Sequence, residues 1–340
     1  MSLDHARPAT APVAAAPDPS PVRPGAVPVT WLDRAATWGM PVVLLLLVAW
    51  AAITYPGFLD SGNLRNILAQ NAPVGIIAIA MTLVMVGGGF DLSVGSIFGC
   101  GSVAFAALYT HVPGGLALVA VLLVGTVLGL VNGVLVTKVH VNPFVATLGT
   151  GSIYGGAALM ASHSSPIVVP DPSFTQLGQG SFAGIPYAIW ILVVVTVVLG
   201  LLLARSVYGH RLYAVGGGHE AARLAGIRVD VVRASTYVVA GAAAALGGAV
   251  LASRLGVGQG DVGVNIPLEA IAMVVIGGTS LFGGEGSVLR TCTGLGILAV
   301  LGNVADSNGW GAEVENVVQG SIVILAVALD AFVRSRRGRS

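Results

Sequence analysis

The chain has 340 residues, of which 55% are hydrophobic and only 9% are charged, and its mean hydropathy is +0.88. A soluble domain carries about 25% charged residues, so this composition excludes an ordinary water-soluble fold and indicates a polytopic membrane protein. The net charge of +1 gives no sign of a nucleic-acid partner, and the single lysine, Lys138, is not placed to complete a Walker A nucleotide loop.

Three regions are expected along the chain. Residues 1–35 are predicted to form a disordered cytoplasmic tail, because they are rich in proline and contain little that could pack. Residues 36–334 form the predicted membrane domain, and residues 335–340 a short basic cytoplasmic tail.

The membrane domain contains about ten apolar segments, and a spanning helix needs about 20 mostly apolar residues. The clearest candidates are 40–55, 66–86, 116–136, 187–203, 234–251 and 317–332. Three further candidates, richer in Gly, Ser and Thr, are 92–109, 144–161 and 287–303. Segment 266–278 is too short for an ordinary span and is expected to be broken or re-entrant. The predicted fold is therefore all-α, with about ten transmembrane helices.

The distribution of basic residues predicts the orientation. With ten spans and a cytoplasmic N-terminus, all of the 16 lysines and arginines except Arg65 and Arg254 fall on the cytoplasmic side. Cytoplasmic loops carry such an excess, so both termini are expected in the cytoplasm.

The sequence also contains a possible internal repeat. Ala-Ile-Ala-Met at residues 78–81 recurs at 270–273, and in both places Gly-Gly and then Gly-Ser follow. Chance similarity in an Ala- and Gly-rich chain is the alternative. Transporters are often built from repeats, with the substrate path where interrupted segments face each other.

The first predicted break is GGGFDLSVGS at residues 87–96. Three consecutive glycines are poor helix formers, and unwound backbone at membrane depth must line a cavity or be buried in protein. Asp91, Ser93 and Ser96 therefore either border a gate in the translocation path or simply cap the following helix.

The second predicted break is residues 276–287 and contains Gly277 and Gly278, with Glu269 before it and Glu285 inside it. Carboxylates in membrane segments are rare and usually face a pathway, so both are candidate path residues. A solvated turn explains Glu285 equally well.

The segment VNPFVATLGT at residues 141–150 is typical of a helix start, with Asn142 as the N-cap and proline at the first helical position. Thr147 and Thr150 then form a polar stripe that could hydrogen-bond a polyhydroxylated ligand, and Phe144 is assigned to the same candidate path. Contact between helices explains the stripe about as well.

The charged stretch 205–233 contains the best candidate for a docking surface. Glu220, Ala221 and Ala222, followed by Gly226, predict a short exposed helix ended by glycine. A basic loop lying on anionic lipid is the alternative.

Motifs for chemistry are missing from the sequence. The G-x-G-x-x-G at residues 258–263 follows no predicted strand, and neither H-E-x-x-H nor G-x-S-x-G occurs. We predict no catalytic residue, no metal site and no cofactor in this chain, which is therefore not expected to be an enzyme.

Four stretches together resemble one family: GGGFDLSVGS, VNPFVATLGT, YAVGGGHEAARLAGI and IGGTSLFGGEGS. They are similar to the permease subunits of ribose/xylose/arabinose ABC importers, in matching order over most of the chain. The resemblance implies a second permease copy, a cytoplasmic ATP-binding subunit that uses ATP and Mg²⁺, and an extracytoplasmic sugar-binding protein. It also implies a bacterial plasma membrane location, and an E-A-A-x-x-x-G coupling helix formed by Glu220, Ala221, Ala222 and Gly226.

We therefore expect a permease subunit that translocates a monosaccharide by alternating access. An ion-coupled secondary transporter using Asp91, Glu269 or Glu285 is an alternative, and an intramembrane enzyme is a more distant one. Within the importer class, a cyclic polyol, a furanone-type signal or a branched-chain amino acid could replace the sugar.

Overall fold

The computed structural model describes residues 31–311 together with 314, 317, 318, 320, 321, 324 and 328, with side chains from Trp38 onward. Most of the predicted N-terminal tail, most of the candidate segment 317–332 and the predicted tail 335–340 lie outside the described residues. The nine apolar helices of the described part are α1 (Trp31–Thr54), α2 (Ser61–Val86), α3 (Val94–Tyr109), α4 (Gly114–Thr137), α5 (Pro143–Ala161), α7 (Tyr187–Arg205), α10 (Val229–Leu255), α11 (Ile266–Ile276) and α12 (Val288–Ser307).

Among the described residues, six helices are long and apolar enough to cross a membrane: α2, α4, α5, α7, α10 and α12. Three shorter apolar helices, Trp38–Thr54 within α1, α3 and α11, lie in the same bundle. The prediction of a largely helical membrane protein is confirmed, whereas the number of ten spans stays a prediction.

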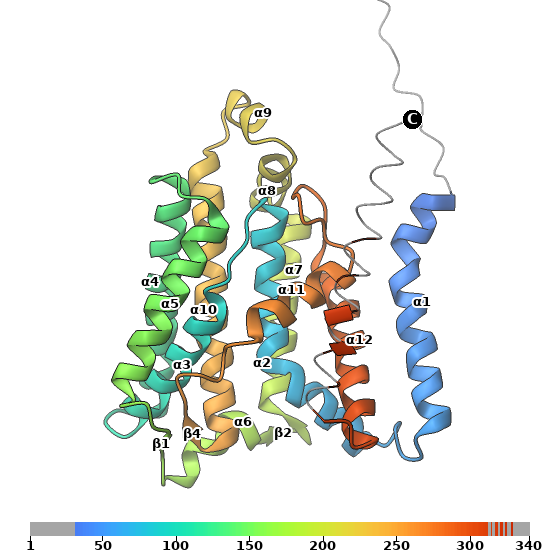
Figure 1. Ribbon diagram of the computed structural model, residues 1–340, viewed down its shortest axis with the longest axis vertical. Coiled ribbons are helices and arrows are strands. Elements are labelled where there is room, and N and C mark those ends of the chain that lie inside the picture. Colours follow the sequence, from blue (N-terminus) through green and yellow to red (C-terminus); the bar gives the residue numbers. More distant parts are fainter. Residues whose placement is uncertain are drawn as a thin grey trace, which may run out of the picture.

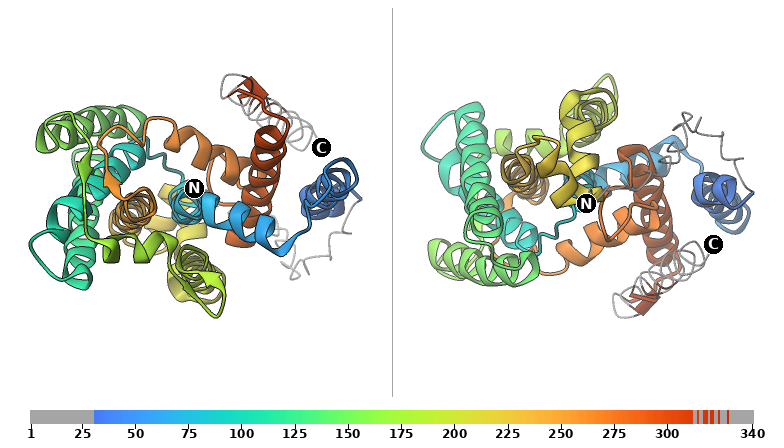
Figure 2. Two further views of the ribbon diagram at one scale, coloured as in Figure 1. Left: turned by 90° about the horizontal axis from the view of Figure 1, so that it is seen from below. Right: turned by 90° about the horizontal axis from the view of Figure 1, so that it is seen from above.

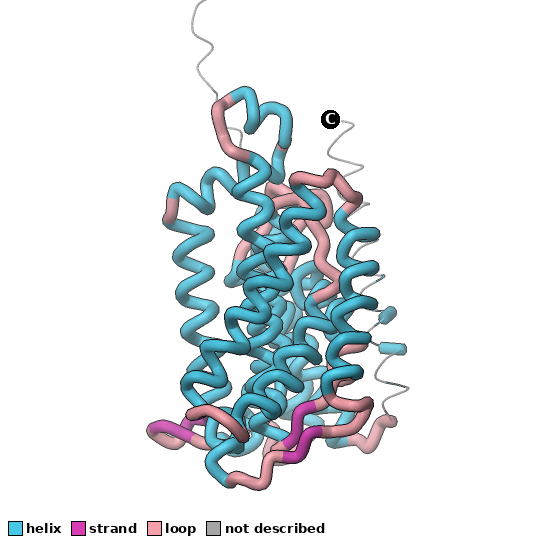
Figure 3. Tube along the Cα trace, turned by 90° about the vertical axis from the view of Figure 1, so that its left-hand side faces the viewer, coloured by secondary structure: helices cyan, strands magenta, loops and turns pink. Residues whose placement is uncertain are grey.

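Short elements gather at the two ends of the bundle (Figures 1 and 3). One end, which we call the strand end, carries β1 (Ile167–Val168) paired with β4 (Val257–Gly258), β2 (Ser181–Phe182) paired with β3 (Ile185–Pro186), the 3₁₀ turn η1 (Pro172–Thr175) and α6 (Gln176–Gln179). The other end, the α9 end, carries α8 (Val207–Gly217) and α9 (His219–Leu224). The two small antiparallel sheets are an addition to the predicted all-α fold.

Helix α2 is the centre of the bundle, as the end-on views show (Figure 2). The most apolar 18-residue window of α2 is 78% buried, against 22% for α4 and 28% for α7. Helices α4 and α7 instead expose large apolar side chains, among them Leu123, Val127, Val194 and Leu201. Exposed apolar surface of this extent suits lipid acyl chains.

Helices α4 and α10 touch backbone to backbone. Gly125, Gly129 and Gly133 recur every four residues along one face of α4. A Cβ at any of them would meet backbone atoms of α10, including the carbonyls of Tyr237 and Gly241. Small residues at this spacing allow the close helix approach that drives packing in membranes.

The two predicted helix breaks are confirmed, and both helices end with the same cap. The amide of Gly87 bonds to the carbonyl of Leu83, and the amide of Gly277 bonds to that of Met273, each at 3.0 Å. The next residues, Gly88 and Gly278, have φ of +73° and +89°, which favours glycine. This shared cap is a local likeness, and a repeat of the two halves of the chain stays a prediction.

Candidate functional site

The predicted short helix of the charged stretch is present as α9 at the outermost part of the α9 end (Figure 1). Gly226 follows it with φ of +79°, and the amides of Gly226 and Ile227 bond to the carbonyls of Arg223 and Ala222 at 3.0 Å. These bonds satisfy the last carbonyls of the helix, so Gly226 ends α9 as the sequence predicted.

Helix α9 rests on one small residue and exposes the others. Ala222 is only 4% exposed, whereas the neighbouring Leu224 is 82% exposed. Glu220 and Ala221 are also exposed. A large apolar side chain held out on a polar end of the molecule makes a good contact point for a protein partner.

Charged side chains tie α9 to two other helices. Asp230, in the first turn of α10, lies 3.6 Å from Arg223 of α9 and 3.3 Å from Lys138 at the end of α4. Arg223 also lies 3.8 Å from Glu220. Because these side chains are partly exposed, each pair contributes about 1 kcal/mol or less. The Arg223–Asp230 pair links α9 to the first turn of α10, which Lys138 in turn contacts.

Directly beneath α9, three glycine pairs that are distant in sequence come together: Gly87–Gly88 after α2, Gly216–Gly217 at the end of α8, and Gly283–Gly284 in the second break. We call these six residues the glycine junction. The amide of Gly284 donates a hydrogen bond of 2.9 Å to the carbonyl of Val86. A Cβ on Gly216 would meet that same carbonyl and the amide of Gly284, and a Cβ on Gly283 would lie 2.8 Å from the Cα of Gly88.

His219, the first residue of α9, connects this helix to the junction. Its imidazole hydrogen-bonds the backbone of Gly87. Partial burial and the nearby guanidinium groups of Arg233 and Arg223 hold the pKa of His219 below its ordinary value, against the opposing effect of the Gly87 bond. His219 therefore links the exposed helix to the first break.

The residues of the first break lie inside the protein. Asp91 and Ser93 are fully buried, and one carboxylate oxygen of Asp91 accepts hydrogen bonds from the amide of Ser93 at 2.9 Å and from its hydroxyl at 2.6 Å. Asn132 of α4 donates to the same hydroxyl at 2.6 Å. Ser96 lies against Gly155 of α5. Helix α3 begins after Ser93 without a side-chain cap, so Asp91 holds the turn before the helix, and the assignment of these residues to the translocation path stays a prediction.

The start of α5 is as predicted, because the side chain of Asn142 accepts a hydrogen bond from the amide of Phe144 at 3.0 Å. The polar stripe turns inward: Thr147 and Thr150 are buried and donate to the carbonyls of Pro143 and Thr147 at 2.8 and 3.3 Å. Phe144 is 54% exposed. The hydroxyls thus serve the packing of α5 here, and contact of this stripe with a ligand stays a prediction.

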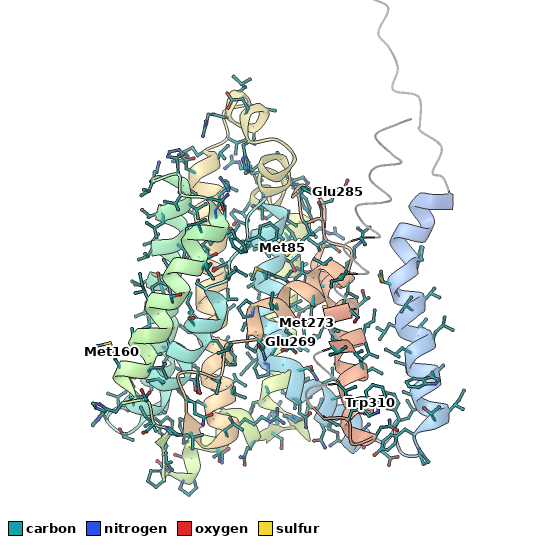
Figure 4. All side chains as sticks on the ribbon, in the orientation of Figure 1. Met85, Met160, Glu269, Met273, Glu285 and Trp310 are labelled. Carbon is teal, nitrogen blue, oxygen red and sulfur yellow. The ribbon has the colours of Figure 1, made fainter. Side chains whose placement is uncertain are left out.

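The two candidate glutamates lie at different depths (Figure 4). Glu285 is exposed near the α9 end, whereas Glu269 is half-buried on the first turn of α11. Between them lie Gly277 and Gly278, and a Cβ on Gly277 would meet the backbone of Arg290 in α12. The structure therefore does not bring the two carboxylates together.

Sequence reasoning missed three residues of this site: Asn132, His219 and Asp230. Asn132 is a single amide in an otherwise apolar 24-residue helix, and polar groups inside membrane helices usually have a partner. Asp230 is an acid within a basic stretch. The sequence shows that Asn132 and Asp230 are unusual in their surroundings, but it does not show which residues they contact. Within the described part of the chain, no group of three or more His, Cys, Asp or Glu residues could hold a metal ion.

Comparison with known proteins identifies the family. Residues 63–327 match the family described as "Branched-chain amino acid transport system / permease component". The ribose import permease protein RbsC of Bacillus subtilis strain 168 is 39% identical over 290 residues, covering 84% of this chain and 90% of that protein. The RbsC protein of Escherichia coli strain K12 is 35% identical over 297 residues, covering 85% and 92% of the two chains.

The L-arabinose ABC transporter permease protein AraH of Azospirillum brasilense is 33% identical over 300 residues, covering 88% of each chain. No solved structure matches. These findings confirm the resemblance carried by the four sequence stretches, and they cover the helices, both breaks and α9. The protein is therefore a permease subunit, a member of the family described as the branched-chain amino acid transport system permease component.

Proposed function

We propose that this protein is the membrane-spanning subunit of an ATP-driven importer that translocates a monosaccharide. The sequence contains no Walker A loop, and we assign the supply of energy to a separate ATP-binding subunit. The relatives named for ribose and arabinose support a sugar as the solute. A non-sugar solute remains the alternative that the experiment below distinguishes.

The observation that carries the proposal is the path of contacts from α9 to both helix breaks. Leu224 and Glu220 are exposed at the tip, where an ATP-binding subunit would dock. His219 then contacts Gly87, and Gly284 is hydrogen-bonded to Val86. A displacement of α9 would therefore act together on the end of α2 and on the loop that follows α11, which is what alternating access requires of a coupling helix.

The orientation of the molecule follows from its charges. Arg205, Arg211, Arg223, Arg228 and Arg233 lie in or beside α8 and α9, whereas Arg65 and Arg254 lie toward the strand end. The excess of basic residues at the α9 end supports a cytoplasmic location for that end. The strand end then faces outward and receives the sugar from an extracytoplasmic binding protein, and a second permease copy completes the path.

Reconstitution tests this function. The permease is purified from its native membranes, the co-purifying proteins are identified, and the complex is placed in proteoliposomes with labelled D-ribose or L-arabinose. We expect a Walker-type ATPase in the preparation and uptake that needs ATP and resists an uncoupler. A stable preparation without an ATPase, or uptake abolished by the uncoupler and indifferent to ATP, would contradict the proposal. If ATP drives the uptake of another solute but not of these two sugars, the transported substrate is that solute and not a sugar.

A further inference from the structure

A polar cavity of about 290 Å³ lies among α2, α10, α11 and α12, toward the strand end of the bundle. Its apolar side is made by Ile67, Leu298 and Ala299, with Gly302 beside them. The other lining residues all carry hydrogen-bonding side chains: Gln70, Asn71, Arg254, Glu269, Asn303 and Asp306.

Hydrogen bonds between elements hold the wall of this cavity. Asn63 of α2 and Asn303 of α12 exchange two amide hydrogen bonds of 3.2 and 3.1 Å, which join these helices at the rim. On the opposite side, Gln179 of α6 donates to the carbonyl of Arg254 at 2.8 Å, and the hydroxyl of Ser253 accepts from Gly178 at 2.8 Å. These bonds join α2 to α12 and α6 to α10 beside the cavity.

The chemistry of the lining favours a neutral polyhydroxylated ligand. Glu269 and Asp306 accept hydrogen bonds, Arg254 donates them, and the three amides of Gln70, Asn71 and Asn303 do both. A sugar ring presents hydroxyl groups that donate and accept along its edge, so it can satisfy both kinds of group at once. An ion of either sign would leave groups of its own charge facing it. The volume lies at the lower limit of small-molecule sites, which suits a single ring.

The cavity is also linked to the glycine junction. Glu269 lies in the first turn of α11, and the same helix ends in the break at Gly277. With 11 residues, α11 is about 16 Å long. A displacement of the break therefore moves a wall of the cavity through one short, rigid helix.

We propose that this cavity is the site at which the permease first receives the monosaccharide, with Glu269 and Arg254 as its main hydrogen-bonding groups. The proposal rests on the proposed function and adds a location and a chemistry to it. Loading occurs at the strand end, and α11 connects the loaded cavity to the cytoplasmic break.

Two substitutions, Glu269→Gln and Arg254→Gln, test the site in the reconstituted complex. Their matched controls are Asp261→Asn and Arg65→Gln, which alter an exposed acid and an exposed base at the same end but outside the cavity. Uptake of labelled D-ribose or L-arabinose is measured over a range of loaded binding protein, and ATPase activity without sugar is measured in parallel. Binding of the same sugars to the purified complex is followed directly by saturation-transfer NMR.

We expect each cavity substitution to raise the half-saturating concentration about tenfold or more, because a hydrogen bond to a charged group is lost. The direct sugar signal falls in both cavity variants, and the controls behave like the unaltered protein. Unchanged half-saturation and unchanged sugar signal in both cavity variants would overturn the proposal, as would equal losses in the controls.

The experiment can contradict the cavity site without contradicting the proposed function. If the unaltered complex imports sugar but the cavity variants match the controls, the site is wrong and the function stands. If the complex imports no sugar and gives no saturation-transfer signal with either probe, both proposals are wrong. A sugar signal that disappears only in the cavity variants supports the site whatever the transport assay shows.

Discussion

The amide of Gly284 and the carbonyl of Val86 are joined by a hydrogen bond of 2.9 Å, although 198 positions separate the two residues. This bond connects the end of the central helix α2 to the loop that follows α11. Gly216, at the end of α8, lies against both partners. The two helix breaks and the exposed helix α9 therefore meet at one point, and the predictions below test that point and its surroundings.

Replacing Gly216 with valine should abolish transport. A Cβ at this position would meet the carbonyl of Val86 and the amide of Gly284, both of them backbone atoms that cannot turn aside. Overpacking of this kind costs about 1–3 kcal/mol and would separate α8 from both breaks. ATP-driven uptake is the measurement, normalised to the amount of protein in the membrane.

The matched control is Gly217→Ala, because a Cβ on Gly217 would meet no atom within 4 Å. This control should insert and transport normally. Normal uptake by Gly216→Val would mean that the close contact at the glycine junction is dispensable.

At Gly226 the requirement is backbone conformation and not space. Its φ is +79°, and a Cβ there would meet nothing within 4 Å. Left-handed backbone costs an ordinary residue about 1–2 kcal/mol, and asparagine tolerates it best. Gly226→Val should therefore lose uptake and ATPase binding while still inserting, whereas Gly226→Asn should retain both. Equal behaviour of the two variants would show that the turn conformation is unimportant.

Asp230→Asn should weaken coupling without harming the fold. The substitution removes the ion pairs with Lys138 and Arg223, which are partly exposed and contribute about 1 kcal/mol or less each. We expect the affinity for the ATP-binding subunit to fall by no more than about fivefold, with a smaller effect at high salt.

A double-mutant cycle with Arg223→Gln isolates the pair. The combined substitution should cost less than the sum of the two single ones, because both single substitutions remove the Arg223–Asp230 pair, while Asp230→Asn also removes the Lys138 pair and Arg223→Gln the Glu220 pair. Strict additivity of the two effects would mean that Asp230 does not act through Arg223.

His219 predicts a dependence on pH. Its pKa is held below the ordinary value of 6.5 by partial burial and by Arg233 and Arg223. The unfolded chain therefore binds the proton more readily than the folded protein, so the stability present above pH 6.5 is lost as the pH falls below it. The apparent Tm of the purified protein should decrease between about pH 7.5 and pH 5.5, and His219→Gln should reduce this decrease.

The control for this measurement is His163→Gln, which alters an exposed histidine outside the α9 end. The apparent Tm of this variant should change with pH as it does in the unaltered protein. An identical profile in His219→Gln and in the unaltered protein would exclude His219 as the responsible group.

Local features of the fold were predictable because short-range rules determine them. The breaks at Gly87 and Gly277, the N-cap Asn142 and the glycine stop at Gly226 each follow from the backbone preference of one residue type. The structure confirms all four.

The assembly of these pieces was not predictable from the sequence. Lipid tails are as apolar as leucine, so hydropathy cannot separate the largely buried α2 from the largely exposed α4. For the same reason the inward direction of Thr147 could not be deduced from the stripe. Gly87, Gly216 and Gly284 come together through tertiary contacts, and no periodic pattern in the sequence indicates those contacts.

The backbone contact between α4 and α10 has one more consequence. Helices that touch through glycine have few side-chain rotamers between them to absorb a displacement. Helix α10 has 27 residues and is about 40 Å long, with Asp230 beside α9 at one end and Arg254 in the polar cavity at the other. Because α4 stiffens α10, we expect a tilt imposed at the α9 end to change the position of Arg254 at the far end.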